Sequence, residues 1–198
     1  MTDKDFPANA TLAPTAVWGS RLTIRPLQAE DRPAVRASLE RLSTQTLARR
    51  FHSAGLRITE SVLDSVTAGR VLVAEVGDVI VALGSYYPDS DAVKAEVGIV
   101  VDDAYQRRGI GLALSACLCR DALCAGVQQL QGEVEGSNRG VLRLFRRLNL
   151  PMTVTWAEGG MQVEITLEPG SAQPALALQD NEHEGSGEHY RVRGRKTA

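Results

Sequence analysis

Apolar residues along the chain follow two spacings, and these predict a mixture of strands and helices. Alternation of apolar and polar residues is typical of a half-buried strand, whereas apolar residues three and four positions apart are typical of a helix. Strand patterns and turn residues predict strands at residues 21–27, 70–76, 79–87, 93–101, 128–135, 152–156 and 161–167. Helical spacing predicts helices at residues 29–42, 43–52, 59–67, 109–125 and 138–148.

Residues at the element boundaries support this division. Ser43 or Thr44 is a suitable N-cap for the second helix and Thr59 for the third, because their hydroxyl oxygens can accept from free helix N–H groups. Gly77 and Asp78 form a hairpin signal between two strands. Since helices and strands mix without strict alternation, a simple doubly wound sheet is excluded, and a mixed α/β (α+β) fold is expected.

Length and charge limit the organisation and the partners of the protein. The chain has 198 residues, 43% of them hydrophobic, and a formal net charge of -2, which fits one globular domain and argues against a broad nucleic-acid-binding surface. We expect a flexible segment at residues 1–19, the folded domain at residues 20–168, and a disordered tail at residues 169–198, which is polar and Gly-rich. The apolar stretches of the whole chain are too short to span a membrane, and residues 1–10 lack the pattern of a signal peptide. A cytoplasmic protein with no membrane partner is therefore expected.

Three cysteines lie within one predicted apolar helix. Cys117, Cys119 and Cys124 are predicted to be buried free thiols, since neighbouring side chains on a helix point in different directions and cannot bridge. The histidines lie in unrelated segments, so no set of four converging zinc ligands is apparent. We therefore assign no metal.

The segment between the predicted strand at 93–101 and the helix at 109–125 carries candidate binding chemistry. Gly109 and Gly111 allow the backbone to pass close to a ligand, and the free N–H groups of the first helical turn favour an anion. Arg107 and Arg108 add positive charge. The segment suits a pyrophosphate, although two glycines before a helix are also compatible with a simple tight turn.

A Rossmann dinucleotide site is the alternative pyrophosphate site for this segment. Glu133 lies at a suitable distance beyond Gly111 to hold a ribose. Against this, position 114 is Leu where a small residue is needed, and several predicted strands precede the motif instead of following it. NAD binding is therefore not expected.

Residues 106–111, Gln-Arg-Arg-Gly-Ile-Gly, resemble the acetyl-CoA signature Gln/Arg-x-x-Gly-x-Gly/Ala of the GNAT superfamily of N-acetyltransferases. The order of elements from Leu22 to Leu167 is similar to that fold, and residues 135–139 resemble the Asn-led start of the family's next helix. Residues 22–27, 43–51 and 95–98 look like the acetyltransferase domain of bacterial protein lysine acetyltransferases. The resemblance implies a central twisted, mostly antiparallel sheet of about seven strands with helices on both faces.

The resemblance also implies the donor and the residues that hold it. Acetyl-CoA would be the co-substrate, with its pantetheine arm paired to backbone near Ile99 and Val101 and also contacted by Asn138. Backbone amides would bind its pyrophosphate, and Gln106 fills the family's Gln/Arg position. The pyrophosphate-binding segment that the resemblance implies comprises Arg107, Arg108, Gly109, Ile110, Gly111 and Leu112.

The reaction needs a group that takes a proton from the acceptor. A lysine amine has a pKa of about 10.4 and is almost fully protonated at neutral pH. Glu96 is the candidate general base, because it lies on the strand that leads into the pyrophosphate-binding segment and matches the base position of the lysine-acetylating relatives. Glu133 and Glu135 are the rival candidates for the base. Alternatively, Glu96 is a surface carboxylate that forms an ion pair with Lys94.

The general acid and the acceptor are less well defined. Many relatives place a tyrosine seven residues after the asparagine as general acid, but this chain has Phe145 there. Candidates to line the acceptor side are Arg49, Arg50, His52, Tyr86 and Tyr87. A protein lysine is the expected acceptor. A small-molecule amine and a non-catalytic acyl-CoA-binding module are the alternatives, and a homodimer is left open.

Overall fold

The computed structural model describes residues 22–157, 160–168, 178–180 and 190–192. Within these residues, nine strands form one sheet in the order β6-β7-β5-β4-β3-β2-β1-β9-β8. The strands are β1 (Leu22–Pro26), β2 (Arg70–Val76), β3 (Val79–Pro88), β4 (Lys94–Val101), β5 (Gln129–Val134), β6 (Met152–Ala157), β7 (Gly160–Thr166), β8 (Leu178–Asp180) and β9 (Tyr190–Val192). Neighbouring strands are antiparallel except β4 and β5, which are parallel. Strands β1 to β7 confirm the predicted sheet.

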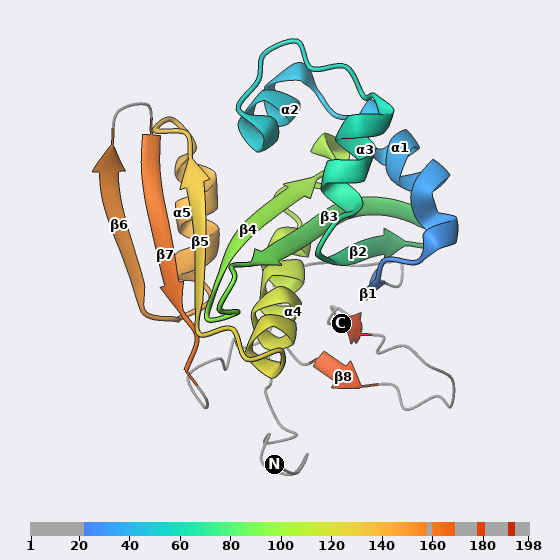
Figure 1. Cartoon of the computed structure of the whole chain (residues 1–198). Coiled ribbons are helices and arrows are strands. Elements are labelled where there is room, and N and C mark those ends of the chain that lie inside the picture. The colour runs from blue at the N-terminus through green and yellow to red at the C-terminus, as the bar shows by residue number, and fades with distance from the viewer. Residues whose placement is uncertain (1–21, 158–159, 169–177, 181–189, 193–198) are drawn as a thin grey trace, which may run out of the picture.

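The helices lie on both faces of this sheet, as predicted (Figure 1). The α-helices are α1 (Arg32–Glu40), α2 (Thr44–Phe51), α3 (Glu60–Thr67), α4 (Ile110–Cys124) and α5 (Arg139–Arg146). Two 3-10 turns, η1 (Ala29–Asp31) and η2 (Asp103–Tyr105), precede α1 and α4. The predicted caps are present, since the hydroxyls of Ser43 and Thr59 accept from the backbone N–H groups of Thr46 and Val62.

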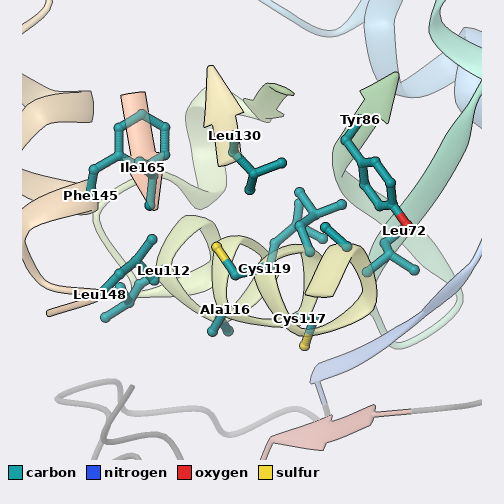
Figure 2. Close-up of a cluster of buried hydrophobic side chains, with 14 of the residues drawn as sticks. Leu72, Tyr86, Leu112, Ala116, Cys117, Cys119, Leu130, Phe145, Leu148 and Ile165 are labelled. Carbon is teal, nitrogen blue, oxygen red and sulfur yellow. The ribbon is translucent and has the colours of Figure 1, made fainter. Parts of the chain in front are cut away.

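Each face of the sheet buries its own apolar cluster. On one face, α1, α2 and α3 cover a cluster that includes Leu39, Leu63, Val73 and Leu83. On the other face, α4 and α5 cover a larger cluster, part of which Figure 2 shows. Alternate residues of one strand serve the two clusters, as strand geometry requires.

Helix α4 lies in the middle of the larger cluster and is buried on most of its surface. The sulfurs of Cys117 and Cys119 point to different sides of this helix in Figure 2, and both side chains are buried. Cys124, in contrast, is exposed, because it lies in the last turn, where the helix leaves the core. The prediction of free thiols is confirmed, but the prediction that Cys124 is buried is wrong.

A polar network links α4 to the sheet inside this core. The Tyr86 hydroxyl donates to Asp121 Oδ2 at 2.6 Å, and Arg70 donates to both carboxylate oxygens of Asp121. Tyr86 is fully buried, so burial, followed by the hydrogen bond to Asp121, raises the pKa of its phenol. These bonds satisfy a carboxylate that would otherwise be costly to bury.

The two terminal segments lie mostly outside the described residues. The segment at residues 1–19, predicted to be flexible, is not described, nor is most of the predicted tail at 169–198. Within the span of that tail, β9 pairs with β1 and β8 pairs with β9. None of the described helices combines the length and the apolar character needed to cross a bilayer.

Candidate active site

A cavity of about 740 Å³ opens where β4 and β5 diverge. These parallel strands pair only from Lys94 to Glu96 and from Gln129 to Gln131, and beyond that register they separate toward α2 (Figure 1). Helix α2 and His52 line one side, α5 lines another, and the loop before α4 lines the end of β4. The cavity therefore gives access to the edge of β4 from both faces of the sheet.

The loop before α4 has the backbone geometry of an anion site. Arg107 and Gly109 both have positive φ angles, 58° and 90°, so the chain turns sharply before Ile110 begins the helix. No side chain caps this helix at Gly109, which leaves its first N–H groups available to a ligand. The helix is 15 residues long, and its positive dipole end faces this loop. A pyrophosphate fits these donors.

Gly111 brings α5 against the start of α4. A Cβ atom added at Gly111 would lie 2.8 Å from Leu144 Cδ1, closer than real Cβ contacts allow. Leu144 therefore packs directly over the first turn of α4. This contact places the cavity-facing residues of α5 next to the anion-binding loop.

Hydrogen bonds fix the loop to the rest of the site. The Gln106 side-chain amide donates to the Val101 carbonyl at 3.0 Å and to Thr46 Oγ1 at 3.3 Å. Asp103 accepts from the backbone N–H of Ser43 and from the hydroxyls of Ser43 and Thr46. Burial alone would raise the pKa of Asp103, but these hydrogen bonds outweigh it and lower the pKa. Helix α2 is thus tied to the end of β4.

Asn138 begins α5 at the edge of the same cavity. Its Oδ1 accepts from the backbone N–H of Val141 at 3.3 Å, so this oxygen caps the helix. Its Nδ2 donates to no other described residue and remains available to a ligand in the cavity.

Glu96 lies on the α2 side of β4, at the point where the strands begin to diverge. Val100 belongs to the cluster under α1 to α3, and side chains at 96, 98 and 100 share a face. The Glu96 carboxylate is exposed and makes no hydrogen bond or ion pair with the described residues, so it is not held by Lys94. It therefore remains free to contact a ligand.

Arg50 lies close to Glu96, which the sequence did not predict. Its guanidinium lies against Gly98, because a Cβ at that position would lie 2.5 Å from Arg50 Cζ. Burial lowers the pKa of Arg50, while the charges of Tyr87 and Glu96 act in the opposite direction. Nη2 donates to Ser85 Oγ at 3.4 Å. The cation is thus held against Gly98, two residues from Glu96 on the same face of β4.

The rival carboxylates have different surroundings. Glu133 lines the cavity and is exposed. Glu135 lies beyond the end of β5, where it forms an ion pair with Arg49 at 3.5 Å and accepts from Ser137 Oγ at 2.7 Å. Since these contacts occupy both of its oxygens, Glu135 is the weaker candidate for a base.

The cavity brings together most of the residues that the sequence singled out. Apart from Glu96, the predicted residues that line it are Ile99, Val101, Gln106, Arg107, Gly109, Gly111, Leu112 and Asn138. Arg108 does not line it, because its guanidinium lies over the ring of Tyr105, 5.4 Å from the centroid. On the acceptor side, the predicted cavity residues are Arg49, Arg50 and His52.

Other candidates lie elsewhere, and two cavity-lining arginines were not predicted. Tyr86 is held by Asp121 in the core, and the Tyr87 hydroxyl donates to the Ser65 carbonyl, so neither tyrosine lines the cavity. Arg143 and Arg147 of α5 do line it, although the sequence analysis did not select them. The available signal was a helix rich in arginine, already expected next to the loop, but its sequence does not show which of the arginines face the cavity.

The described residues include no group of three or more histidine, cysteine, aspartate or glutamate side chains arranged to hold a metal. The phosphate loop, the diverging strands and the unpaired carboxylate together define a site suited to a nucleotide-bearing acyl donor and an amine.

Comparison with known proteins agrees with a site for an acyl donor and an amine. The sequence model of the Acetyltransferase (GNAT) family matches residues 32–150. The GNAT domain of PAT from S. lividans superposes with a TM-score of 0.69 at 22% identity, over 82% of this chain and 100% of that one. The putative acetyltransferase yncA from Salmonella typhimurium, solved with its cofactor acetyl-CoA, has a TM-score of 0.57 at 21% identity, over 75% and 95% of the two chains.

A third similar structure is the ribosomal-protein-S18-alanine N-acetyltransferase from Escherichia coli, with a TM-score of 0.55 at 23% identity over 75% of this chain and 94% of that one. The chain belongs to the GNAT acetyltransferase family. It is an acetyl-CoA-dependent N-acetyltransferase with the mixed α/β fold of that family.

Proposed function

We propose that the protein transfers the acetyl group of acetyl-CoA to a lysine side chain on a protein surface, by direct attack in a ternary complex with Glu96 as general base. The observation that carries this proposal is the position of Glu96. Its carboxylate pairs with no other described residue, lines the cavity and lies on the α2 side of β4, opposite the face covered by α4 and α5.

The donor enters from the α4 and α5 face. The pyrophosphate binds the N-terminus of α4, and the pantetheine arm lies along the edge of β4 that β5 leaves unpaired after Glu96. Backbone near Ile99 and Val101 and the free amide of Asn138 offer hydrogen bonds to the arm. The arm thus directs the thioester into the gap between the strands.

The acceptor enters from the α2 face, where Glu96 meets it. At pH 7 about one lysine amine in 2,500 is neutral, so removal of the ammonium proton limits attack unless a base accepts it. The Glu96 carboxylate, directly or through a water molecule, takes this proton. The neutral nitrogen then attacks the thioester carbonyl, the C–S bond breaks to release the CoA thiolate, and the nitrogen loses its second proton to water or to that thiolate.

Arg50 positions the general base. Arginine stays protonated in proteins, so the guanidinium of Arg50 attracts the Glu96 carboxylate and helps to hold it in position. Gly98 supports this arrangement, since any larger residue there would occupy the place of the guanidinium. Arg50 thus acts through Glu96 and need not touch the acceptor.

The departing thiolate leaves without a dedicated acid at position 145. Phe145 is buried and carries no proton to donate. An ordinary thiol has a pKa of about 8.5, so the CoA thiolate is a tolerable leaving group near neutral pH. A covalent acetyl-cysteine route is disfavoured, because burial raises the pKa of Cys119 to about 12 and Cys117 is also fully buried.

The charge of the acceptor side favours a protein over a small polyamine. Arg49, Arg50 and His52 line the α2 side, whereas a pocket for a free cationic amine would gather carboxylates there. A lysine on a protein surface carries a single charge at the end of a long stem and can reach Glu96 between these residues. The ribosomal-protein acetyltransferase, a similar structure, is named for an amine on a protein.

An acceptor panel tests the lysine assignment. CoA release and acetylated product are measured with matched peptides that carry either one internal lysine and a blocked N-terminus, or a free N-terminal alanine and no lysine, together with spermidine and free amino acids. The proposal expects the lysine peptides to have the highest kcat/KM. Turnover restricted to N-terminal or small amines would contradict it, as would CoA binding without turnover of any acceptor.

A further inference from the structure

Helix α5 carries a set of cations that the mechanism above does not use. Its sequence, with the following C-cap, contains four arginines and no acidic residue: Arg139, Arg143, Arg146 and Arg147. Basic residues in the last turn of a helix stabilise its negative dipole end in general. That effect does not explain why only some of these side chains face the cavity.

Arg143 and Arg147 line the cavity, whereas Arg139 and Arg146 do not. The two cavity-lining arginines are four residues apart, so their side chains leave the same face of α5 one above the other. Both are exposed, and no carboxylate among the described residues lies within 4.0 Å of either guanidinium. Two adjacent cations without an anionic partner thus face the donor side of the site.

The contact between α5 and α4 places these cations near the pyrophosphate. Leu144, the residue after Arg143, packs over Gly111 in the first turn of α4. Arg143 and Arg147 line the same cavity as Gly109 and Gly111 of the anion-binding loop. A second anionic group of the donor, attached close to the pyrophosphate, would lie within reach of these arginines.

CoA carries such a group, the 3′-phosphate monoester on its ribose. This group bears more than one negative charge near neutral pH, and planar guanidinium groups bind phosphate oxygens in a bidentate manner. The free N–H groups at the start of α4 are available to the pyrophosphate, and Arg107 lines the same cavity. We infer that Arg143 and Arg147 form a subsite for the 3′-phosphate, and that they select CoA over its dephosphorylated form.

This inference rests on the donor being acetyl-CoA, but it does not depend on the acceptor or on Glu96. Calorimetry with CoA and with dephospho-CoA, at one ionic strength and without acceptor, measures the subsite alone. The quantity of interest is the ratio of the two dissociation constants. We expect the wild-type protein to bind CoA at least about tenfold more tightly, because hydrogen bonds to charged groups contribute on this scale.

Arg143→Gln and Arg147→Gln should each reduce this ratio several-fold, and the double variant should bring it close to one. The affinity for dephospho-CoA should stay within about twofold of wild type, since the pyrophosphate loop is unchanged. The control Arg146→Gln removes the same charge from the same exposed helix, away from the cavity, and should leave the ratio unchanged.

Equal binding of the two ligands by the wild-type protein would overturn the inference. A loss of affinity that is the same for both ligands in the Arg143 and Arg147 variants would also overturn it. An equal effect of the control Arg146→Gln would do the same, because it would indicate only the overall positive charge of the helix. Glu96→Gln should retain the wild-type ratio. Failure of lysine acetylation with an intact ratio would therefore refute the proposed acceptor and leave the subsite standing.

Discussion

The guanidinium of Arg50 occupies the position where any residue other than glycine at position 98 would place its Cβ atom. Arg50 comes from α2 and Gly98 from the middle of β4, and Glu96 is two residues away on the same face of the strand. The contact fixes the distance between the acceptor-side helix and the strand that carries the proposed base. Several properties of the site depend on it.

Gly98→Ala should reduce catalysis without removing donor binding. The added methyl group displaces Arg50 and with it the cation beside Glu96, so kcat/KM for the acceptor should fall about 10- to 100-fold. The dissociation constant for CoA should change little, because the pyrophosphate loop does not involve this residue. Steady-state kinetics and calorimetry check the two quantities.

A matched control is available on α5. Gly140 also lines the cavity, but a Cβ there would meet its nearest neighbour, Asn138 Oδ1, at an ordinary 3.5 Å. Gly140→Ala should therefore retain most of the activity. An equal loss in both alanine variants would show that Arg50 has no special role.

The hydrogen bonds of Asp103 to α2 should make the free energy of unfolding depend on pH in the acid range. The pKa of Asp103 is lowered in the folded protein, so its contribution is present above the ordinary aspartate pKa of about 3.9 and is lost as the pH falls through the lower folded value. Asp103→Asn should cost about 1 kcal/mol at pH 7. Urea unfolding of both proteins from pH 7 to pH 3 should show this difference shrinking below about pH 4.

Asp78, in the turn between β2 and β3, provides the control. Asp78→Asn removes a carboxylate without touching α2, so its effect on the free energy of unfolding should be small. If Asp103→Asn lost no more stability than this control, the three bonds to Ser43 and Thr46 would contribute nothing measurable.

The buried phenol of Tyr86 should contribute to the stability of the core. Tyr86→Phe removes the donor at 2.6 Å from Asp121 Oδ2 and should lower the free energy of unfolding by about 1–2 kcal/mol. Arg70 still pairs with the carboxylate, which limits the loss. In Tyr87→Phe the lost bond is a more exposed one, to the Ser65 carbonyl, so the effect should be smaller. Denaturant unfolding of the two variants compares them directly, and a reversed order would contradict this account.

Gly84 sets the distance between β3 and α4. A Cβ at this position would overlap Leu118 Cδ1 and lie 3.1 Å from Leu114 Cγ, both on the buried face of the helix. Gly84→Ala should therefore lower stability by about 1–3 kcal/mol through overpacking. Thermal unfolding checks this, and an unchanged midpoint would mean that α4 shifts at no cost.

The fold was predictable because local signals and the global arrangement agree. The apolar alternation at 70–76 became β2 with the same bounds, and Ser43 and Thr59 cap the helices that follow them. The divergence of β4 from β5 was not predictable from hydrophobic patterning, because a change of strand direction leaves no periodic signal in either strand.

Contacts between distant segments explain what the sequence did not predict. Arg50 was only one of several acceptor-side candidates, and its place against Gly98 depends on how α2 docks on β4. Tyr86 was another, yet its face of β3 meets Asp121 of α4 in the core. The sequence alone also could not show which of Arg143 and Arg146 faces the cavity, since this depends on the packing of Leu144 on Gly111.

The central claim is that Glu96 is the base in an acetyl transfer whose donor site is independent of it. The most direct test is kcat/KM of Glu96→Gln for a lysine peptide, measured across pH beside Glu133→Gln and beside CoA binding to each protein. We predict that Glu96→Gln lowers kcat/KM about 100-fold or more, that Glu133→Gln stays near wild type, and that both bind CoA normally. Wild-type kcat/KM for Glu96→Gln at every pH, or a larger loss in Glu133→Gln, would contradict the account.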